Sequence, residues 1–514
     1  MKQVSVATLL SATMCAVAMA DNLWTYANGS LTKTIPNGGD EGADLIWTLP
    51  VSWNAATGAL TVNAGITCEG AEMGDLDLRD ATVTGDGFAE PVPVTSLSTG
   101  AAVLSGKTNV SAFFANHVAT LGARSFYENT VIRDIRLYGE SATIRFDYYN
   151  WAGKCTALTN AVLDLGLTSI PGTLFGGCSQ LSVDIATLVK PHFTSIAAQA
   201  FANTAVYGKL ECTNLVFIGA TAFAKTKLSE VVLRGTATTL PTSPSRNGGV
   251  FQGITTLTNA VLDLPLDTVG DSAFSGCTAL ACPASQILPP GVTTLGPNAY
   301  NSCPISGPVI LTNLASMSVG AFVASAISDI RIAGELTTLP ANSNDVGPFY
   351  QVTALTNIVL SCPNFQSIVG NSCAGMNASS AHPITSITIG STNRVSVEAN
   401  SFRYQPVTSV TFYGPAPELA SINGILVGRT ATANTAAKPS TLFVSKRQAG
   451  WLSDDVRSDA SDTERDLWMA ANPDRKPKAL LGVLKRDATD KSKAYLVDTP
   501  SPFDPFAGFF LYLN

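Results

Sequence analysis

The sequence predicts a repeat solenoid of α/β to mostly β class, in which short units stack along one axis. An eight-residue run, Leu158 to Leu165, recurs letter for letter at Leu257 to Leu264 and in near-identical form from Leu355. The copies are 99 and 98 residues apart, and shorter related runs recur every 18 to 29 residues between Ile132 and Val407. Self-similarity at a fixed period is the signature of stacked, related units. Four short units therefore make one long repeat.

Each short run predicts one short strand. Apolar residues fall at positions 1, 4 and 6 of many runs, and the last two share one face of a strand because side chains alternate along it. Pro283 interrupts the run from Leu280 and predicts a short or edge-like strand at best; the run Ile305 to Leu311 is also a poor strand pattern. The residues placed inside are Ile132, Ile135, Leu137; Leu228, Val231, Leu233; Ile327, Ile330, Ile332; Leu355, Ile358, Leu360; Ile384, Ile387, Ile389; and Val407, Val410, Phe412.

A second pattern lies between the strands. Gly270, a small polar residue, Ala273-Phe274 and then Cys277 predict one tight helical or 3₁₀ turn per unit, with the Phe ring tucked under the next strand. Related pairs are Leu174-Phe175, Ala200-Phe201, Ala222-Phe223 and Ala321-Phe322.

Three cysteines lie at similar places in successive long repeats: Cys178, Cys277 and Cys373. We interpret them as small buried hydrophobes. Disulfides stay open as an alternative, whereas a metal site would need ligands at CxxC-type spacing, which the sequence lacks.

Together, the strand and turn patterns resemble the BspA-type leucine-rich repeats of bacterial surface proteins. Val269-Gly270, Ala273-Phe274, Cys277 and Leu280 match the Ile-Gly, Ala-Phe, Cys and Leu positions of that repeat, and looser matches run from about Leu121 to Gly414. The resemblance implies an extracellular solenoid similar to adhesins and host-interaction proteins. It does not indicate which ligand is bound.

Four segments are predicted along the chain. Residues 1–20 predict a cleaved signal peptide, because an apolar stretch follows Lys2 and Ala18-Met19-Ala20 has the small-x-small form of a cleavage site. Residues 21–110 lack the repeat but alternate apolar and polar residues, which predicts a β-rich N-terminal cap. Residues 111–414 carry the leucine-rich repeat solenoid. Residues 415–514 predict a small charged C-terminal module with a strand at Thr441 to Val444 and a capping box at Ser461 to Glu464.

Composition narrows the compartment and the partner. No second apolar run reaches the roughly 18 residues of a membrane helix, so the sequence predicts a secreted or cell-surface protein without a membrane span. Charged residues make up 13% of the chain and the net charge is -7. Such a chain lacks the basic face that nucleic acid requires.

The sequence predicts a protein that is not an enzyme, without catalytic, metal or cofactor residues. His117, His192 and His382 lie in no recognisable nucleophile motif. Asp75 and Asp77, like the acidic loop at 38–44, lack the full spacing of a calcium loop. Two alternatives stay open: an extracellular β-helix enzyme acting on carbohydrate, and a purely structural envelope protein.

The residues beside the inward aliphatic positions line the exposed face of the strands. Aromatic residues and arginine dominate binding hot spots, so we predict that a protein or glycan partner binds there. The alternative is an ordinary solvated sheet face. The predicted anchors are Arg136, Tyr138, Arg234, Arg331 and Tyr413.

Overall fold

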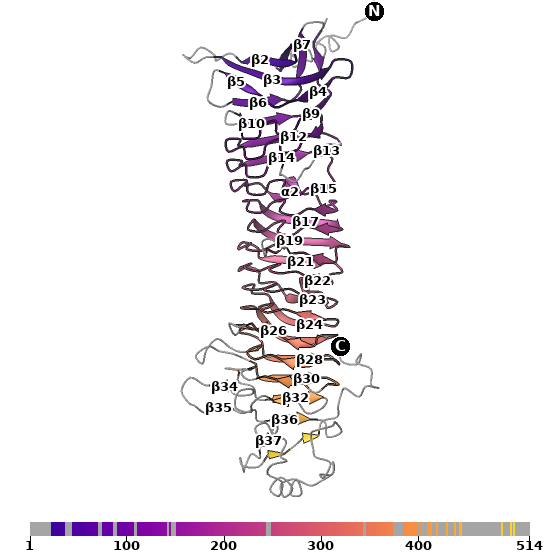
Figure 1. Ribbon diagram of the computed structural model, residues 1–514, viewed down its shortest axis with the longest axis vertical. Helices are drawn as coiled ribbons and strands as arrows, with labels where there is room; N and C mark the ends of the chain where they lie inside the picture. Colours follow the sequence, from indigo (N-terminus) through magenta and orange to yellow (C-terminus); the bar gives the residue numbers. More distant parts are fainter. Residues whose placement is uncertain are drawn as a thin grey trace, which may run out of the picture. The chain divides into compact units, whose positions relative to one another are not determined.

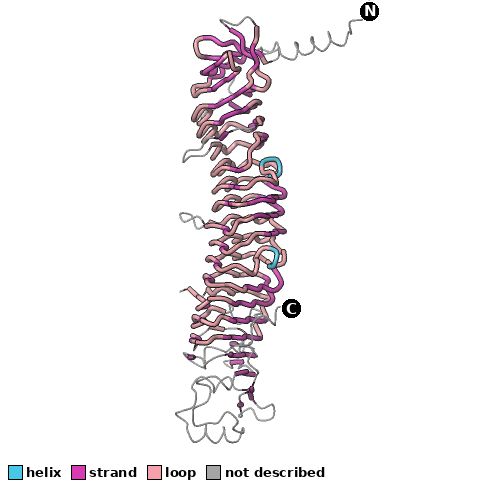
Figure 2. The backbone as a smooth tube through the Cα atoms, turned by 90° about the vertical axis from the view of Figure 1, so that its right-hand side faces the viewer, coloured by secondary structure: helices cyan, strands magenta, loops and turns pink. Residues whose placement is uncertain are grey.

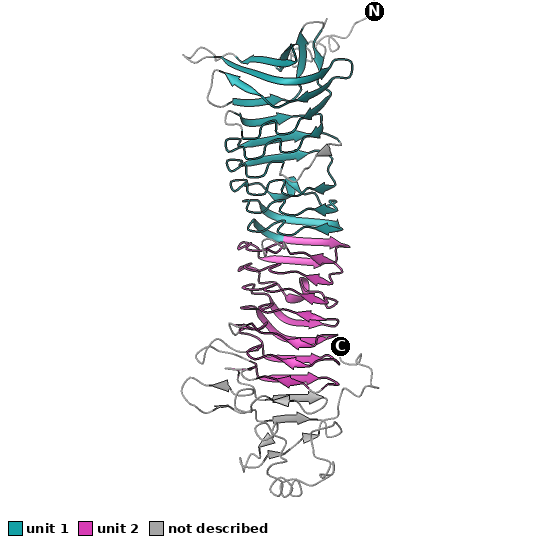
Figure 3. Ribbon diagram, viewed as in Figure 1, with its two compact units in different colours: residues 1–230 teal, residues 231–514 magenta. Residues whose placement is uncertain are grey.

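The computed structural model divides into two compact units, Met1–Glu230 and Val231–Asn514 (Figure 3). The predicted signal peptide and capping box lie outside the described residues, and the four predicted domain boundaries stay predictions. The structure describes residues 22–35, 44–69, 74–85, 90–106, 110–140, 143–144, 151–242, 248–342, 346–373, 384–393, 395–398, 401–402 and 405, and beyond these the backbone of the short strands between 409 and 498.

Unit 1 begins with antiparallel strands that pass into a parallel ladder (Figure 1). The antiparallel pairs join β1 to β2, β2 to β3, and β3 to both β4 and β5, and then β4 pairs in parallel with β9 and β9 with β11. Trp24, Trp47 and Leu49 are buried beneath this sheet. The strands are β1 (Leu23–Ala27), β2 (Ser30–Ile35), β3 (Leu45–Asn54), β4 (Ala59–Val62), β5 (Thr67–Glu69), β7 (Thr82–Gly85), β8 (Val92–Pro93), β9 (Ser96–Thr99), β11 (Val118–Leu121) and β13 (Thr143–Ile144).

Unit 1 also contains two further parallel ladders. The longer strands form a four-stranded sheet in the order β14-β12-β10-β6, and two-residue strands form a second ladder in the order β15-β16-β18. The strand β19 (Lys227–Gly235) contains the point at which the two units divide. The other strands are β6 (Gly74–Leu78), β10 (Val110–Ala115), β12 (Asp134–Tyr138), β14 (Asn160–Asp164), β15 (Ser169–Ile170), β16 (Ser195–Ile196), β17 (Tyr207–Leu215) and β18 (Phe217–Ile218).

Unit 2 again combines a ladder of longer strands with ladders of two-residue strands, here two of them. The long ladder runs β24-β26-β28-β30-β32-β36-β39, and the short ladders run β20-β22-β23-β25 and β27-β29-β31-β33. The strand-dominated parallel solenoid predicted from the period is thereby confirmed. Ile305 to Leu311, predicted to be a poor strand, contains the six-residue β24, which carries a register shift at Gly307/Pro308.

The strands of unit 2 are β20 (Thr239–Leu240), β21 (Asn259–Asp263), β22 (Thr268–Val269), β23 (Thr294–Leu295), β24 (Ser306–Leu311), β25 (Ser316–Met317), β26 (Ala326–Ala333), β27 (Thr338–Leu339), β28 (Asn357–Ser361), β29 (Ser367–Ile368), β30 (Ser386–Gly390), β31 (Ser396–Val397), β32 (Ser409–Tyr413), β33 (Glu418–Leu419), β34 (Gly428–Arg429), β35 (Ala436–Ala437), β36 (Thr441–Val444), β37 (Lys485–Arg486), β38 (Ala494–Tyr495) and β39 (Val497–Asp498).

Two repeats replace the expected strand by a helical turn (Figure 2). The helix α2 (Ile185–Leu188) follows Asp184, whose carboxylate accepts the N–H of Ala186 at 2.9 Å, and η1 (Ala284–Gln286) follows Pro283. At the strand position itself, the described residues of these two repeats form only isolated β-bridges, Asp184 with Tyr207 and Pro283 with Ser306. An N-cap and a proline both favour a helical start over a ladder strand, so the prediction of one strand in every unit is wrong at these two places.

The aliphatic positions predicted to face inward are buried wherever their side chains are described. In all five of these runs, from Ile132 to Ile389, the predicted residues are at most 2% exposed. The run from Val407 to Phe412 lies outside the described side chains. Val232, which the alternation places on the outer face, is also buried, at 4% exposed.

A column of aromatic rings runs through the core of each unit. In unit 1 the rings of Phe113, Phe126, Trp151, Phe175, Phe201 and Phe223 follow one another. In unit 2 the rings of Phe251, Phe274, Tyr300, Phe322 and Phe349 stack with centroids 5.1 to 6.2 Å apart. These contacts confirm the prediction that the Phe of the turn is tucked into the core.

The segment that carries each aromatic ring consists of consecutive tight turns. On either side of Phe274, Ser272 and Gly276 have positive φ of 56° and 76°, which interrupts a right-handed helix. The Cys277 N–H donates to the Phe274 carbonyl within the turn, whereas the Phe274 N–H donates to Ala299 in the next unit. This segment does not continue as the expected helical or 3₁₀ turn, because alternate N–H groups donate to carbonyl groups of the next repeat.

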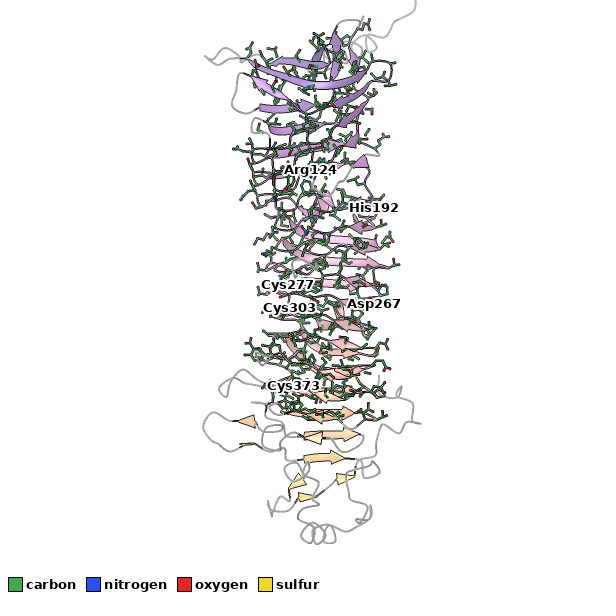
Figure 4. All side chains as sticks on the ribbon, viewed as in Figure 1. Arg124, His192, Asp267, Cys277, Cys303 and Cys373 are labelled. Atoms are coloured by element: carbon green, nitrogen blue, oxygen red, sulfur yellow. The ribbon has the colours of Figure 1, made fainter. Side chains whose placement is uncertain are left out.

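The cysteines of the solenoid are buried and unpaired. Each of the nine cysteines within the described part of the chain has a free thiol. Cys178 and Cys277 each follow a Phe by three residues and donate to a carbonyl of the preceding unit, at 3.0 and 3.1 Å. Figure 4 labels Cys277 and Cys303 on successive turns. Cys373 is buried as predicted, but it occupies the aromatic position itself, since its N–H donates to Ser401 just before Phe402.

Candidate partner-binding face

A row of partly exposed side chains crosses the outer face of the sheet β6-β10-β12-β14. Asp77, Phe114, Arg136 and Val162 lie opposite one another on these four strands. Their neighbours in each strand point inward and are buried, because side chains alternate between the two faces. The pleat of four parallel strands therefore brings an acidic, an aromatic, a basic and an aliphatic side chain into one row.

The ring of Phe114 is flanked by two guanidinium groups. The Cζ atom of Arg79 lies 4.8 Å from the ring centroid and the Cζ atom of Arg136 lies 5.4 Å from it. A cation within about 6 Å of an aromatic face is attracted by the ring quadrupole. Phe114 on β10 thereby contacts Arg79, which directly follows β6, and Arg136 in the middle of β12.

Each arginine is held by an aspartate two residues earlier. The Nη2 atom of Arg79 lies 2.6 Å from Oδ2 of Asp77, and the Nη2 atom of Arg136 lies 2.7 Å from Oδ2 of Asp134. In both pairs Nε also donates to the carboxylate, which is the bidentate geometry of strong arginine–carboxylate contacts. The hydrogen bond to the aspartate raises the pKa of each guanidinium.

Two further residues extend this row. The Nδ2 atom of Asn160 donates to Asp134 at 2.9 Å from the next strand, and Tyr138 lies partly exposed on the same face as Arg136. We call Asp77, Arg79, Phe114, Asp134, Arg136, Tyr138 and Asn160 the arginine–phenylalanine row.

The predicted anchors are only partly brought together. Arg136 and Tyr138 lie in the arginine–phenylalanine row. Arg234 is exposed on β19, and Arg331 lies on β26, where its Nε donates to Asp329 at 3.0 Å. Tyr413 belongs to β32, but its side chain lies outside the described residues.

Sequence reasoning missed Arg79, Phe114 and Asp134, and it considered Asp77 only as a calcium ligand. Arg79 lies in the segment without the repeat, and Phe114 reaches this row only through the register of β10. The spacing Asp-x-Arg, which occurs at Asp77, Asp134 and Asp329, is the signal that could have identified the pairs, because residues two apart share a strand face.

The residues considered for chemistry are dispersed. His117 and His192 are exposed, and Nε2 of His192 lies 3.4 Å from the Leu167 carbonyl oxygen; His382 lies outside the described residues. Asp75 accepts a hydrogen bond from Ser111 at 2.6 Å. Over the described ranges, no three His, Cys, Asp or Glu side chains are grouped as metal ligands would be. Those ranges also hold no helix with the length and apolar character to cross a membrane.

Two solved structures are similar to this chain. A leucine-rich repeat protein from Bacteroides ovatus ATCC 8483 is 18% identical, with 78% of this chain and 94% of that chain covered and a TM-score of 0.44. A leucine rich cell surface protein from Faecalibacterium prausnitzii A2-165 is 16% identical, with 64% and 94% covered and a TM-score of 0.30. No curated protein matches the sequence significantly.

The family model described as the BspA type leucine rich repeat region (6 copies) matches residues 99–228 and 244–376, slightly more than half of the chain. These segments contain the strands β10 to β18 and β21 to β29. The chain belongs to the BspA-type leucine-rich repeat family.

Proposed function

We propose that this protein is secreted or displayed at the cell surface and binds an extracellular protein or glycan through the arginine–phenylalanine row. The observation that carries the proposal is the contact of Phe114 with both Arg79 and Arg136. Arginine and aromatic residues are enriched among the side chains that contribute most to binding. The family and the predicted signal peptide support the location.

The row is held in place before any partner arrives. Arg136 is 42% exposed and Asp134 is 20% exposed, yet two strands fix the aspartate through Arg136 and Asn160. Exposed ion pairs contribute only about 0–1 kcal/mol to stability, so their stabilising effect alone does not account for the arrangement. Side chains that are already ordered lose less conformational entropy on binding.

We propose that the protein binds its partner without catalysing a reaction on it. Recognition through a sheet face needs positioned donors, acceptors and apolar surface, and it requires no activated nucleophile or base. A purely structural envelope role is the competing function, and it requires no dependence on Phe114.

The test is binding of the full chain to an array of extracellular-matrix proteins and glycans, with release of soluble sugar measured on the same glycans. We expect saturable binding that Phe114→Ala weakens at least tenfold, without sugar release. The matched control is Tyr207→Ala, because Tyr207 is an aromatic residue, 46% exposed, that is not part of the row. Sugar release would identify an enzyme, and absence of binding across the array would favour the structural role.

A further inference from the structure

The arrangement around Arg136 occurs a second time, in unit 2. Ile310, Arg331 and Val359 lie opposite one another on β24, β26 and β28. Phe114, Arg136 and Val162 hold the same three places on β10, β12 and β14. Each row therefore places a large apolar residue, an arginine and a valine side by side on three parallel strands. Ile310, the apolar residue of the second row, is 40% exposed.

The polar partners are also the same. Arg331 bonds Asp329 at 3.0 Å, and Asn357 on the next strand donates to Asp329 at 2.7 Å. Around Asp134, Nε of Arg136 likewise donates at 3.0 Å, and Asn160 donates at 2.9 Å. The two aspartates are 22% and 20% exposed, so each anchors an arginine that reaches further into solvent.

The repeat period alone does not explain why the arrangement around Arg136 recurs around Arg331. The equivalent place in the intervening long repeat is Val232 on β19, which is only 4% exposed. Glu230 stands where the aspartate would be, two residues earlier. The chain therefore carries the exposed arginine in the first and third long repeats and a buried valine in the second, although the asparagine persists at Asn259.

The chemistry of the two places suits a neutral, hydroxyl-rich ligand. Each arginine is already neutralised by its own aspartate, so neither place offers an uncompensated charge to an ion. What remains are planar side chains with spare donors and lone pairs, beside the partly exposed Phe114 at one place and the exposed Ile310 at the other. A sugar ring presents hydroxyl groups at its edge and C–H groups on its faces, and it matches both features.

We propose that the chain has two related sites, at Arg136 and Arg331, that bind the repeating unit of a neutral polysaccharide. This inference rests on the proposed function and assigns a substrate class and a valency to it. A polymer offers the same unit many times, so occupation of both sites raises the overall affinity without any new contact, by about 10²-fold or more.

The test uses the full chain with mannan, dextran and a soluble β-1,3-glucan, each as a polymer and as a short oligosaccharide. Calorimetry with the oligosaccharide that binds is expected to give two sites per chain in the unaltered protein. Arg136→Ala and Arg331→Ala each leave one site, and the double variant leaves none. The polymer affinity falls by roughly 10²-fold in either single variant.

The control is Lys154→Ala. Lys154 and Glu128 form an exposed ion pair of 2.8 Å that lies outside both sites, so this variant keeps two sites and the unaltered polymer affinity. Circular dichroism and melting temperature verify that all variants fold.

The outcomes separate this inference from the proposed function. One site per chain, or loss of all binding in one single variant, overturns the two-site inference and leaves the proposed function standing. Binding to an extracellular protein alone overturns the polysaccharide assignment. Failure to bind any protein or glycan on the array overturns both.

Discussion

The indole of Trp151 packs edge to face against Phe126, with ring centroids 4.8 Å apart and planes at 73°. The backbone bonding assigns the aromatic place of that unit to Ala152, whose N–H donates to Leu174 just as the Phe126 N–H donates to Trp151. Trp151 reaches across from the adjacent position and also contacts Phe175 at 6.1 Å. One side chain therefore maintains the aromatic column at a unit that lacks the Phe.

Trp151→Ala is expected to reduce the free energy of unfolding by about 3–5 kcal/mol, because truncation of a fully buried Trp leaves a large cavity. Trp151→Phe keeps an aromatic ring and removes an indole N–H that has no partner in the described structure, so a much smaller loss is expected. Chemical denaturation followed by circular dichroism measures both. Equal losses in the two variants would contradict the role assigned to the ring.

The sequence predicts the core of this fold well because the inward positions obey one strict pattern. Every unit must bury the same strip against its neighbours, so Ile135 and Leu137 are restricted in the same way as Ile330 and Ile332. Cys373 shows where this reasoning ends. Its spacing resembles that of Cys178 and Cys277, but the register of the turn moves it into the aromatic place, and no spacing in the sequence shows that shift.

The candidate site is less predictable because its members come from different parts of the chain. Arg136 and Tyr138 follow from strand alternation within one repeat. Phe114 and Arg79 join them only because β10 lies between β6 and β12, which is a property of pairing rather than of local pattern. The helical turn at α2 was missed for a local reason, since the Asp184 cap competes with a strand that has weak apolar alternation.

Gly219 is expected to tolerate no side chain. A methyl group built there would overlap the backbone of Ala197 and Ala198 in the neighbouring turn. Gly219→Ala must therefore push two neighbouring repeats apart, and we expect a loss of about 1–3 kcal/mol in unfolding free energy. Gly291→Ala is the control, because nothing lies within 4 Å of the added methyl. Similar stability of the two variants would show that the units are not packed this closely.

The cap of α2 makes a separate prediction. Asp184→Ala removes the acceptor for the Ala186 N–H and is expected to cost about 1 kcal/mol, the usual effect of a lost N-cap. Asp184→Asn retains an acceptor oxygen, so its unfolding free energy should fall by only a small fraction of that amount. Denaturation midpoints of the three proteins decide between them, and an equal loss in both variants would assign the effect to the negative charge.

The buried thiols predict a loss of stability at alkaline pH. Burial raises the pKa of Cys277 from 9.0 to about 12, because a thiolate is poorly solvated in the core. The folded protein therefore holds a proton that the unfolded chain releases above pH 9. The stability contributed by this thiol is complete below pH 9, falls by about 1.4 kcal/mol per pH unit above it, and is lost near pH 12.

Cys277→Thr tests this linkage, since Thr226 occupies the corresponding place three residues after Phe223 and donates to a backbone carbonyl at 2.9 Å. Melting temperatures between pH 8 and 11 are expected to fall less steeply in the variant than in the unaltered protein, because one titrating thiol has been removed. Cys212 and Cys362, whose pKa values burial also raises to about 12, continue to titrate in both proteins. If the melting temperatures of both proteins fell equally with pH, deprotonation of the Cys277 thiol would not be a cause of the loss of stability.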